Sequence, residues 1–254
     1  QRRGRRARVG VMFLPLSDHN PHRHITAPYV TFALIGINVA VFLLTTGLVP
    51  ARTANANALG LGLIPAVITD RASLAAQLVV VPASLTWLTH MFMHAGWMHL
   101  IGNMLFLWVF ADNVEDAMGH VRFLVFYLLC GLVGGGAHLL FNPASQAPLV
   151  GASGAISGVL AAYLILYPRV RVFGLAFNIL PVSIPVWLAL GTWVALQIWH
   201  LLTAQGGATA WWADVGGLAA GAALVGVMKS RDVVFFSHER RLPVTVPHFP
   251  LKRR

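Results

Sequence analysis

This sequence carries little charge for its length. Of its 254 residues only 10% are charged and 57% are hydrophobic, whereas about a quarter of the residues in soluble domains are charged. Acidic residues are the scarcest, with 8 Asp and Glu against 18 Lys and Arg. Apolar runs of roughly 20 residues recur, which is the length that a helix needs to cross a bilayer. The composition therefore excludes a soluble globular domain and predicts an all-α, polytopic membrane protein.

Cysteine is almost absent. Cys130 is the only one, and it lies inside an apolar run, which excludes an intramolecular disulfide. Most of the arginines lie in the two tails. We therefore expect the excess positive charge to attract anionic membrane lipids and not to bind nucleic acid. We also expect no cofactor.

Six apolar stretches predict six membrane-spanning helices. A long connection over residues 50–95, broken by Pro82, is expected to lie partly at the membrane interface. A polar turn that contains three acidic residues is expected after the second span. The predicted spans run from Tyr29 to about Leu48, Trp97 to Phe110, Phe123 to about Phe141, Ser153 to Tyr167, Ile184 to Leu202 and Ala210 to Met228.

The spans divide the chain into three regions. These are a basic tail over residues 1–28, a membrane domain over residues 29–228, and a basic, proline-containing tail over residues 229–254. Cytoplasmic segments are enriched in Lys and Arg, so the charge pattern predicts that both termini are cytoplasmic, in a cell (inner) membrane. The arginines on the inner side would be Arg122, Arg169 and Arg171, against Arg52 and Arg71 outside.

A serine lined by glycines precedes the fourth span, in the stretch Gly151-Ala-Ser153-Gly154. The first turn of a helix offers N–H groups that can stabilise a negative charge developing beside a hydroxyl. The stretch also fits a packing role, because Gly154 and Gly158 form a Gly-x-x-x-Gly contact motif. Ser153 is therefore a candidate nucleophile, and the glycines are candidate helix contacts.

Polar side chains at membrane depth mark two further candidate positions. His99 and Asn103 are one helical turn apart on the second span, so they share a face and can donate hydrogen bonds to an oxyanion. Asp214 shares a face of the last span with Gly217 and Gly221. If these glycines meet those of the fourth span, the carboxyl group lies at about the level of the candidate nucleophile.

Each of these residues also has a purely structural interpretation. His99 and Asn103 would then be an interfacial histidine and an asparagine bonded between helices, and Asp214 would cap a helix or face an aqueous mouth. His90, His94 and His99 together raise the alternative of a metal site. No His-Glu-x-x-His motif is present and no carboxylate lies beside these histidines, so we expect no metal.

The motifs resemble those of the rhomboid intramembrane serine proteases, over most of residues 29–228. Residues 94–103 match the family's His-x4-His-x3-Asn, and residues 151–154 match its nucleophile motif Gly-x-Ser-Gly. The resemblance implies a six-helix rhomboid-like bundle with Ser153 as the nucleophile. It also implies an oxyanion-binding region made by His99, Asn103 and Gly151.

The sequence departs from the family at the catalytic base. The family has a histidine in Ala-His-x-Gly-Gly-x-x-x-Gly, and the same frame here, Ala213 to Gly221, has Asp214 in its place. An unperturbed aspartate is the weaker base by about 2.6 pKa units, or about 3.5 kcal/mol of driving force. His138 and His200 do not occupy the matching position. The Trp-Arg pair of the family's first loop is also missing.

The sequence therefore predicts a rhomboid-family membrane protein with impaired catalysis. Such a pseudoprotease would bind transmembrane segments of partner proteins or be a subunit of a larger membrane assembly. The alternative is an active intramembrane serine endopeptidase that uses Ser153 with a non-standard base. A transporter is disfavoured, because the spans show neither inverted repeats nor an ion site at mid-membrane.

Overall fold

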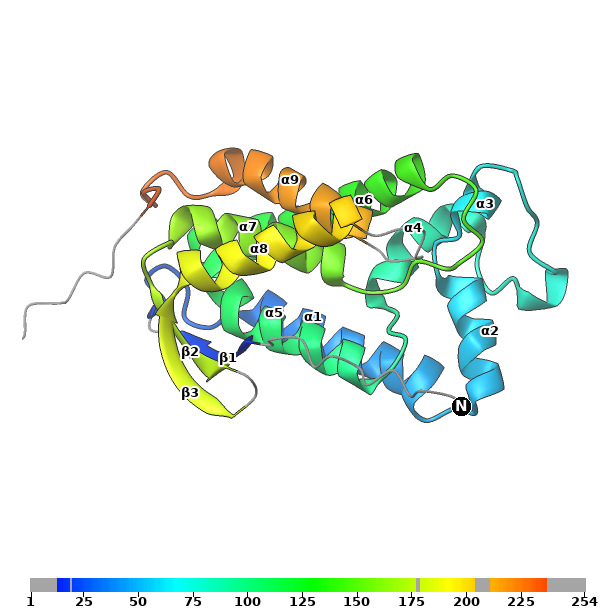
Figure 1. Ribbon diagram of the computed structural model, residues 1–254, viewed down its shortest axis with the longest axis horizontal. Coiled ribbons are helices and arrows are strands. Elements are labelled where there is room, and N and C mark those ends of the chain that lie inside the picture. Colours follow the sequence, from blue (N-terminus) through cyan, green and yellow to red (C-terminus); the bar gives the residue numbers. More distant parts are fainter. Residues whose placement is uncertain (1–12, 19, 177–178, 204–210, 237–254) are drawn as a thin grey trace, which may run out of the picture.

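The computed structural model describes residues 13–18, 20–176, 179–203 and 211–236. Long helices lie at the places of the six predicted spans (Figure 1). A π-helical turn, Leu43–Gly47, extends the first of them. The six are α1 (Tyr29–Phe42), α5 (Trp97–Met118), α6 (His120–Phe141), α7 (Ser153–Leu166), α8 (Val186–Thr203) and α9 (Trp211–Met228).

Several of these helices are long and apolar enough to cross a membrane. Three in the described part of the chain meet this test by length and composition, namely α1 with its extension, α6 and α9. α5 joins them if it counts as one broken span with Ala76–Phe92, from which it is bent by 74°. α7 and the apolar part of α8 are shorter. The chain is a helical membrane protein, and six crossings with both termini on one side remain a prediction.

α7 lies at the centre of the bundle (Figure 1), where it packs against α5, α6 and α9. Its residues from Gly154 to Tyr163 are all buried, which suits a helix that is apolar all round. The surrounding helices expose large apolar side chains on their outer faces, including Trp108, Val133 and Val227. Such faces are expected where lipid surrounds the helices.

The glycine stripes of α7 and α9 meet. A Cβ added at Gly217 would lie 1.8 Å from the carbonyl oxygen of Gly154, and one at Gly221 would lie 2.3 Å from that of Gly158. Any side chain larger than that of glycine would push the two backbones apart. Gly134 of α6 also lies close to α9, because a Cβ added there would be 2.6 Å from the carbonyl oxygen of Ala213.

α5 is longer than predicted. The sequence indicates an end at Phe110 followed by a polar turn, but the helix continues to Met118. The chain then reverses at Gly119, whose φ of +79° favours glycine, and α6 begins at the next residue. The acidic residues of the expected turn therefore lie on the last turns of α5.

These acidic residues bind the chain that leads into α1. Glu115 is buried and accepts hydrogen bonds of 3.0 and 2.8 Å from the backbone N–H groups of Val30 and Thr31. Both N–H groups belong to the first turn of α1, where no partner exists inside the helix. Asp116 accepts three more from the backbone of residues 23–25. Residues expected to belong to a tail are therefore packed against the membrane domain.

A small antiparallel sheet forms at the same end of the bundle. β1 (Phe13–Asp18) pairs with β2 (Arg171–Ala176), which pairs with β3 (Leu180–Pro185). The described chain is mostly helical, as predicted, but the prediction of an all-α protein did not include this sheet. The connection between α7 and α8 alternates between buried and exposed residues, as at Val172 and Phe173, and this is the period of a strand.

The start of the C-terminal region also packs against this end. The N–H of Ser230 donates to the carbonyl of Ala117 (2.8 Å), and the N–H of Phe236 donates to that of Ile165 (3.1 Å). The first residues of the C-terminal region thus contact α5 and α7.

The long connection between α1 and α5 lies at the opposite end of the bundle, near the start of α7 (Figure 1). Proline and glycine divide it into short pieces, in agreement with its broken apolar pattern. It contains α2 (Ala51–Leu61), α3 (Pro65–Ile68), α4 (Thr86–Thr89) and the 3₁₀ turns Ala76–Leu78, Ala83–Leu85 and His90–Phe92.

Candidate active site

A cavity of about 360 Å³ lies beside the first turn of α7. Four helices contribute to its walls, and it brings together four of the five residues that the sequence singled out. The polar or aromatic residues that line it include His99, Asn103 and Phe106 from α5, Ser153 from α7, Trp193 from α8, and Trp211 and Asp214 from α9.

The loop that leads into α7 is held by backbone hydrogen bonds. Leu149 and Leu63 exchange two of them, of 2.8 and 3.1 Å, and the Gly151 N–H donates to the carbonyl of His90 (2.9 Å). Gly151 has a φ of +135°, and a Cβ added to it would lie 2.8 Å from Nε2 of His99. Glycine is therefore required both by the conformation and by the contact. This places the fifth predicted residue directly beside the cavity.

Ser153 is the first residue of α7, and it is half-buried. Its position places a hydroxyl group next to the N–H groups of a helix N-terminus, which suit a developing oxyanion. Ser157 follows one turn later, but its hydroxyl donates to the carbonyl of Ser153 (2.7 Å) and it does not line the cavity. The serine with access to the cavity is Ser153.

The two predicted oxyanion donors share the cavity-lining face of α5. The side-chain nitrogen of Asn103 donates to Nε2 of His94 (3.0 Å), and His94 is buried. The ring of His94 meets the ring of His99 edge-on, with centroids 5.0 Å apart. His94 therefore orients both groups. The contact between His94 and Asn103 was not predicted from the sequence. A bend in the chain separates the two residues, so helical spacing does not relate them.

The histidines do not converge on a metal. His90 is buried, and its Nδ1–H donates to the carbonyl of Thr86 (2.9 Å). Within the described ranges, no three His, Cys, Asp or Glu side chains are placed to hold a metal ion. His138 is not among the residues that line the Ser153 cavity. The side chain of His200 lies outside the described residues.

Asp214 lies on the first turn of α9 and is only 8% exposed. α9 and α5 lie on either side of α7 (Figure 1), so the carboxyl group approaches the cavity from a different side than His99 and Asn103. Among the described residues that line the cavity, Asp214 is the one carboxyl group and His99 the one imidazole. The site thus combines a serine, two hydrogen-bond donors and a carboxyl group.

Comparison with known proteins shows which proteins the chain is similar to. Residues 83–231 match the family model of the rhomboid domain. Rhomboid protease GluP of Bacillus subtilis (strain 168) is 44% identical over 77 residues, which are 30% of this chain and 15% of GluP. Presenilin-associated rhomboid-like protein A, mitochondrial, of Danio rerio is 34% identical over 110 residues, 42% of this chain and 28% of that protein. Rhomboid-like protein 11, chloroplastic, of Arabidopsis thaliana is 38% identical over 80 residues, which are 32% of this chain and 28% of that protein. The chain therefore spans well under half the length of these relatives.

Proposed function

Because the chain belongs to the rhomboid family, we propose that it is a pseudoprotease, which keeps the pocket of an intramembrane serine protease without an effective base. The observation that carries this proposal is Asp214, the carboxyl group that lines the Ser153 cavity from α9. Acyl transfer by a serine needs a base that takes the hydroxyl proton and then returns it to the leaving amine.

Asp214 is poorly suited to that task in either protonation state. As a carboxylate with an ordinary pKa of about 3.9 it is a weak base at neutral pH, and as a carboxylic acid it cannot accept a proton from Ser153. Its side chain is also shorter than that of histidine. Loss of one member of a catalytic unit typically costs about 10⁴–10⁶ in rate.

The residues that could bind a carbonyl group lie close to one another at the cavity. Gly151 keeps the backbone close to His99, and the buried His94 orients Asn103. This supports a binding role, in which the cavity accommodates part of a transmembrane segment of another membrane protein. We propose such segments as its partners, bound singly or within a larger membrane complex.

Labelling with a fluorophosphonate, which reacts with an activated serine, tests this proposal. The wild-type protein should label no faster than Ser153→Ala. The histidine-restored variant, Asp214→His, should label at Ser153 and serves as the positive control. Labelling of the wild type that Ser153→Ala abolishes would contradict the proposal. Copurification from native membranes is a separate test of the binding role, because it identifies the protein that the cavity binds.

One observation favours the alternative of an active protease: the Asp214 carboxyl group and Ser153 share one cavity. If the carboxylate acts as the base, Asp214→Asn removes that base and keeps the size of the side chain. Labelling in the wild type that Asp214→Asn abolishes would therefore identify an unusual Ser–Asp protease. Under the pseudoprotease proposal, Asp214→Asn and the wild type behave alike.

A further inference from the structure

The first turn of α8 is held by backbone hydrogen bonds. The N–H groups of Val186 and Trp187 donate to the carbonyls of Val170 and Pro168, at 2.8 and 2.9 Å. Val186 and Leu190 are buried. These contacts lie at the end of the bundle away from Ser153, so the start of α8 has the position of a hinge.

Further along, α8 forms one wall of the cavity through Trp193. The ring of Trp193 faces Phe106 of α5, with ring centroids 6.5 Å apart. At Gly191, on the same stretch of α8, an added Cβ would meet no atom within 4 Å. A tilt of α8 about its first turn would therefore change the separation of Trp193 and Phe106, and with it the width of the cavity.

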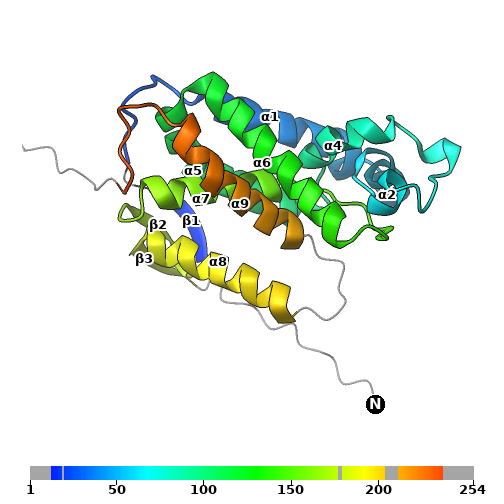
Figure 2. The same cartoon turned by 90° about the horizontal axis from the view of Figure 1, so that it is seen from above.

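In the sequence, the first turn of α8 comes directly after the small sheet. β3 ends at Pro185, one residue before α8, and it pairs with β2 along its whole length. β1 adds a third strand to the other edge of β2, from the pair Phe13–Ala176 to the pair Asp18–Val172. A two-stranded hairpin alone is marginally stable, and a third strand makes it firmer. The start of the chain thus supports the hairpin that leads into α8 (Figure 2).

The last residue of β1 is bonded to two helices. Oδ2 of Asp18 accepts hydrogen bonds from the side-chain nitrogen of Asn113 on α5 (2.9 Å) and from the hydroxyl of Tyr163 on α7. His22 follows shortly after, with Nε2 3.0 Å from Oδ2 of Asp112 on α5. These bonds connect α5 and α7 to the sheet that carries α8.

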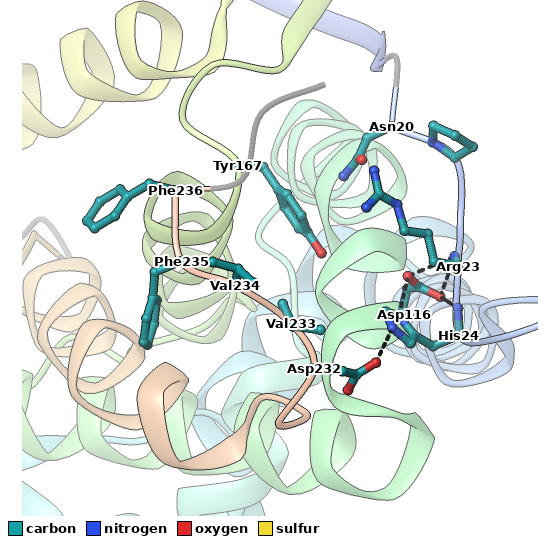
Figure 3. Close-up of a pocket in the computed structure, with 11 residues that line it drawn as sticks. Asn20, Arg23, His24, Asp116, Tyr167, Asp232, Val233, Val234, Phe235 and Phe236 are labelled. Carbon is teal, nitrogen blue, oxygen red and sulfur yellow. Dashed lines mark hydrogen bonds and ion pairs between the residues drawn. The ribbon is translucent and has the colours of Figure 1, made fainter. Parts of the chain in front are cut away.

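A second attachment lies beside a cavity of about 540 Å³, shown in Figure 3. His24 lies between two carboxylates, with Nδ1 3.2 Å from Asp116 of α5 and Nε2 2.7 Å from Asp232 of the C-terminal region. Burial lowers the pKa of His24, but its bonds to Asp116 and Asp232 outweigh burial and raise it. The chain after β1 is thus fixed to α5 by several independent contacts.

We propose that the N-terminal segment (residues 13–18 and 20–25) positions α8 and thereby sets the width of the Ser153 cavity. Asp18 is its main positioning residue, because it joins β1 to both α5 and α7. This inference rests on the proposed function only in taking the cavity as the place where a transmembrane segment binds.

The distance between α5 and α8 near the cavity tests the inference. Nitroxide labels are placed on Ile101→Cys of α5 and Ala195→Cys of α8, both exposed, while the native Cys130 is buried. Pulsed electron paramagnetic resonance in lipid nanodiscs then gives the distance distribution. We expect Asp18→Ala to broaden it and to lengthen the distance by roughly 2–5 Å, the scale of helix shifts in switching proteins.

Two variants separate positioning from a general loss of stability. Ser17→Ala changes an exposed side chain on the same strand and should leave the distance unchanged. Asp18→Asn should restore the wild-type distance, since its carboxamide oxygen can accept both hydrogen bonds. If Asp18→Ala does not fold, Tyr163→Phe removes one of the two bonds and should give a smaller shift in the same direction.

An unchanged distance in folded Asp18→Ala would overturn the inference. The measurement does not involve the chemistry of Ser153, so it can fail or succeed independently of the proposed function. A lengthened distance in a protein that proves to be an active protease would leave the positioning role intact and refute only the pseudoprotease proposal.

Discussion

The contact between α7 and α9 leaves no room for a side chain at Gly217. In Gly217→Ala the new Cβ would lie 1.8 Å from the carbonyl oxygen of Gly154, whereas ordinary contact begins at 3.4 Å, so the two backbones must separate by about 1.6 Å. Overpacking of a well-packed contact costs about 1–3 kcal/mol. We take the upper end, because neither backbone can rotate away as a side chain can.

Alanine also favours the helix over glycine by about 1 kcal/mol, which offsets part of this cost. We therefore expect Gly217→Ala to lower the free energy of unfolding by about 2 kcal/mol. For a chain of this size this corresponds to a fall in Tm of roughly 4–8 °C. Tryptophan fluorescence during heating in a mild detergent measures it.

Gly36→Ala is the matched control, because Gly36 lies within α1 and an added Cβ there meets no atom within 4 Å. It should leave Tm unchanged or raise it slightly. Gly217→Ala with the same Tm as Gly36→Ala would refute the close approach of α7 and α9, and with it the placement of the first turn of α9 beside Ser153.

Three further predictions concern other parts of the fold. Glu115→Ala should cost about 2–3 kcal/mol in thermal unfolding, because it leaves buried N–H groups of α1 without acceptors; a wild-type Tm would contradict this. Gly151→Ala should displace His99 and slow fluorophosphonate labelling of the histidine-restored variant by about 10²–10³, the usual cost of losing an oxyanion donor; equal labelling rates would exclude this role. Burial, with Asp112 nearby, raises the pKa of Asp18 from 3.8 to about 7. Docking of β1 should therefore be strongest below pH 3.8 and weaken as the pH rises to about 7. Amide hydrogen exchange, corrected for its intrinsic pH dependence, should show that the protection of β1 falls over this range. Protection that is constant over this range would contradict it.

Much of the membrane domain could be predicted from local patterns. Apolar runs of helical length placed the six long helices, because burial in lipid requires such runs. The glycines of α7 and α9 could be paired because their spacing follows one helical face. The same spacing brought His99 and Asn103 to the cavity together. These features depend on residues close in the sequence, where helical periodicity is informative.

The features that were missed depend on contacts between distant residues. The carboxylates of Glu115 and Asp116 accept hydrogen bonds from backbone N–H groups about 85 to 93 positions earlier. Nothing in the neighbouring sequence indicates these bonds, so the polar end of α5 was predicted to be a turn. β1 forms because β2 supplies a partner more than 150 residues away. Its sequence is short, contains Pro15 and follows a basic stretch, which favoured the interpretation as a tail.

The most direct test of the central claim is the rate at which reconstituted protein cleaves a transmembrane substrate in liposomes. We predict that the wild type cleaves no faster than Ser153→Ala, and that Asp214→His gains cleavage which a second Ser153→Ala change abolishes. Cleavage by the wild type that disappears in Ser153→Ala would contradict the claim that Asp214 leaves this pocket without an effective base.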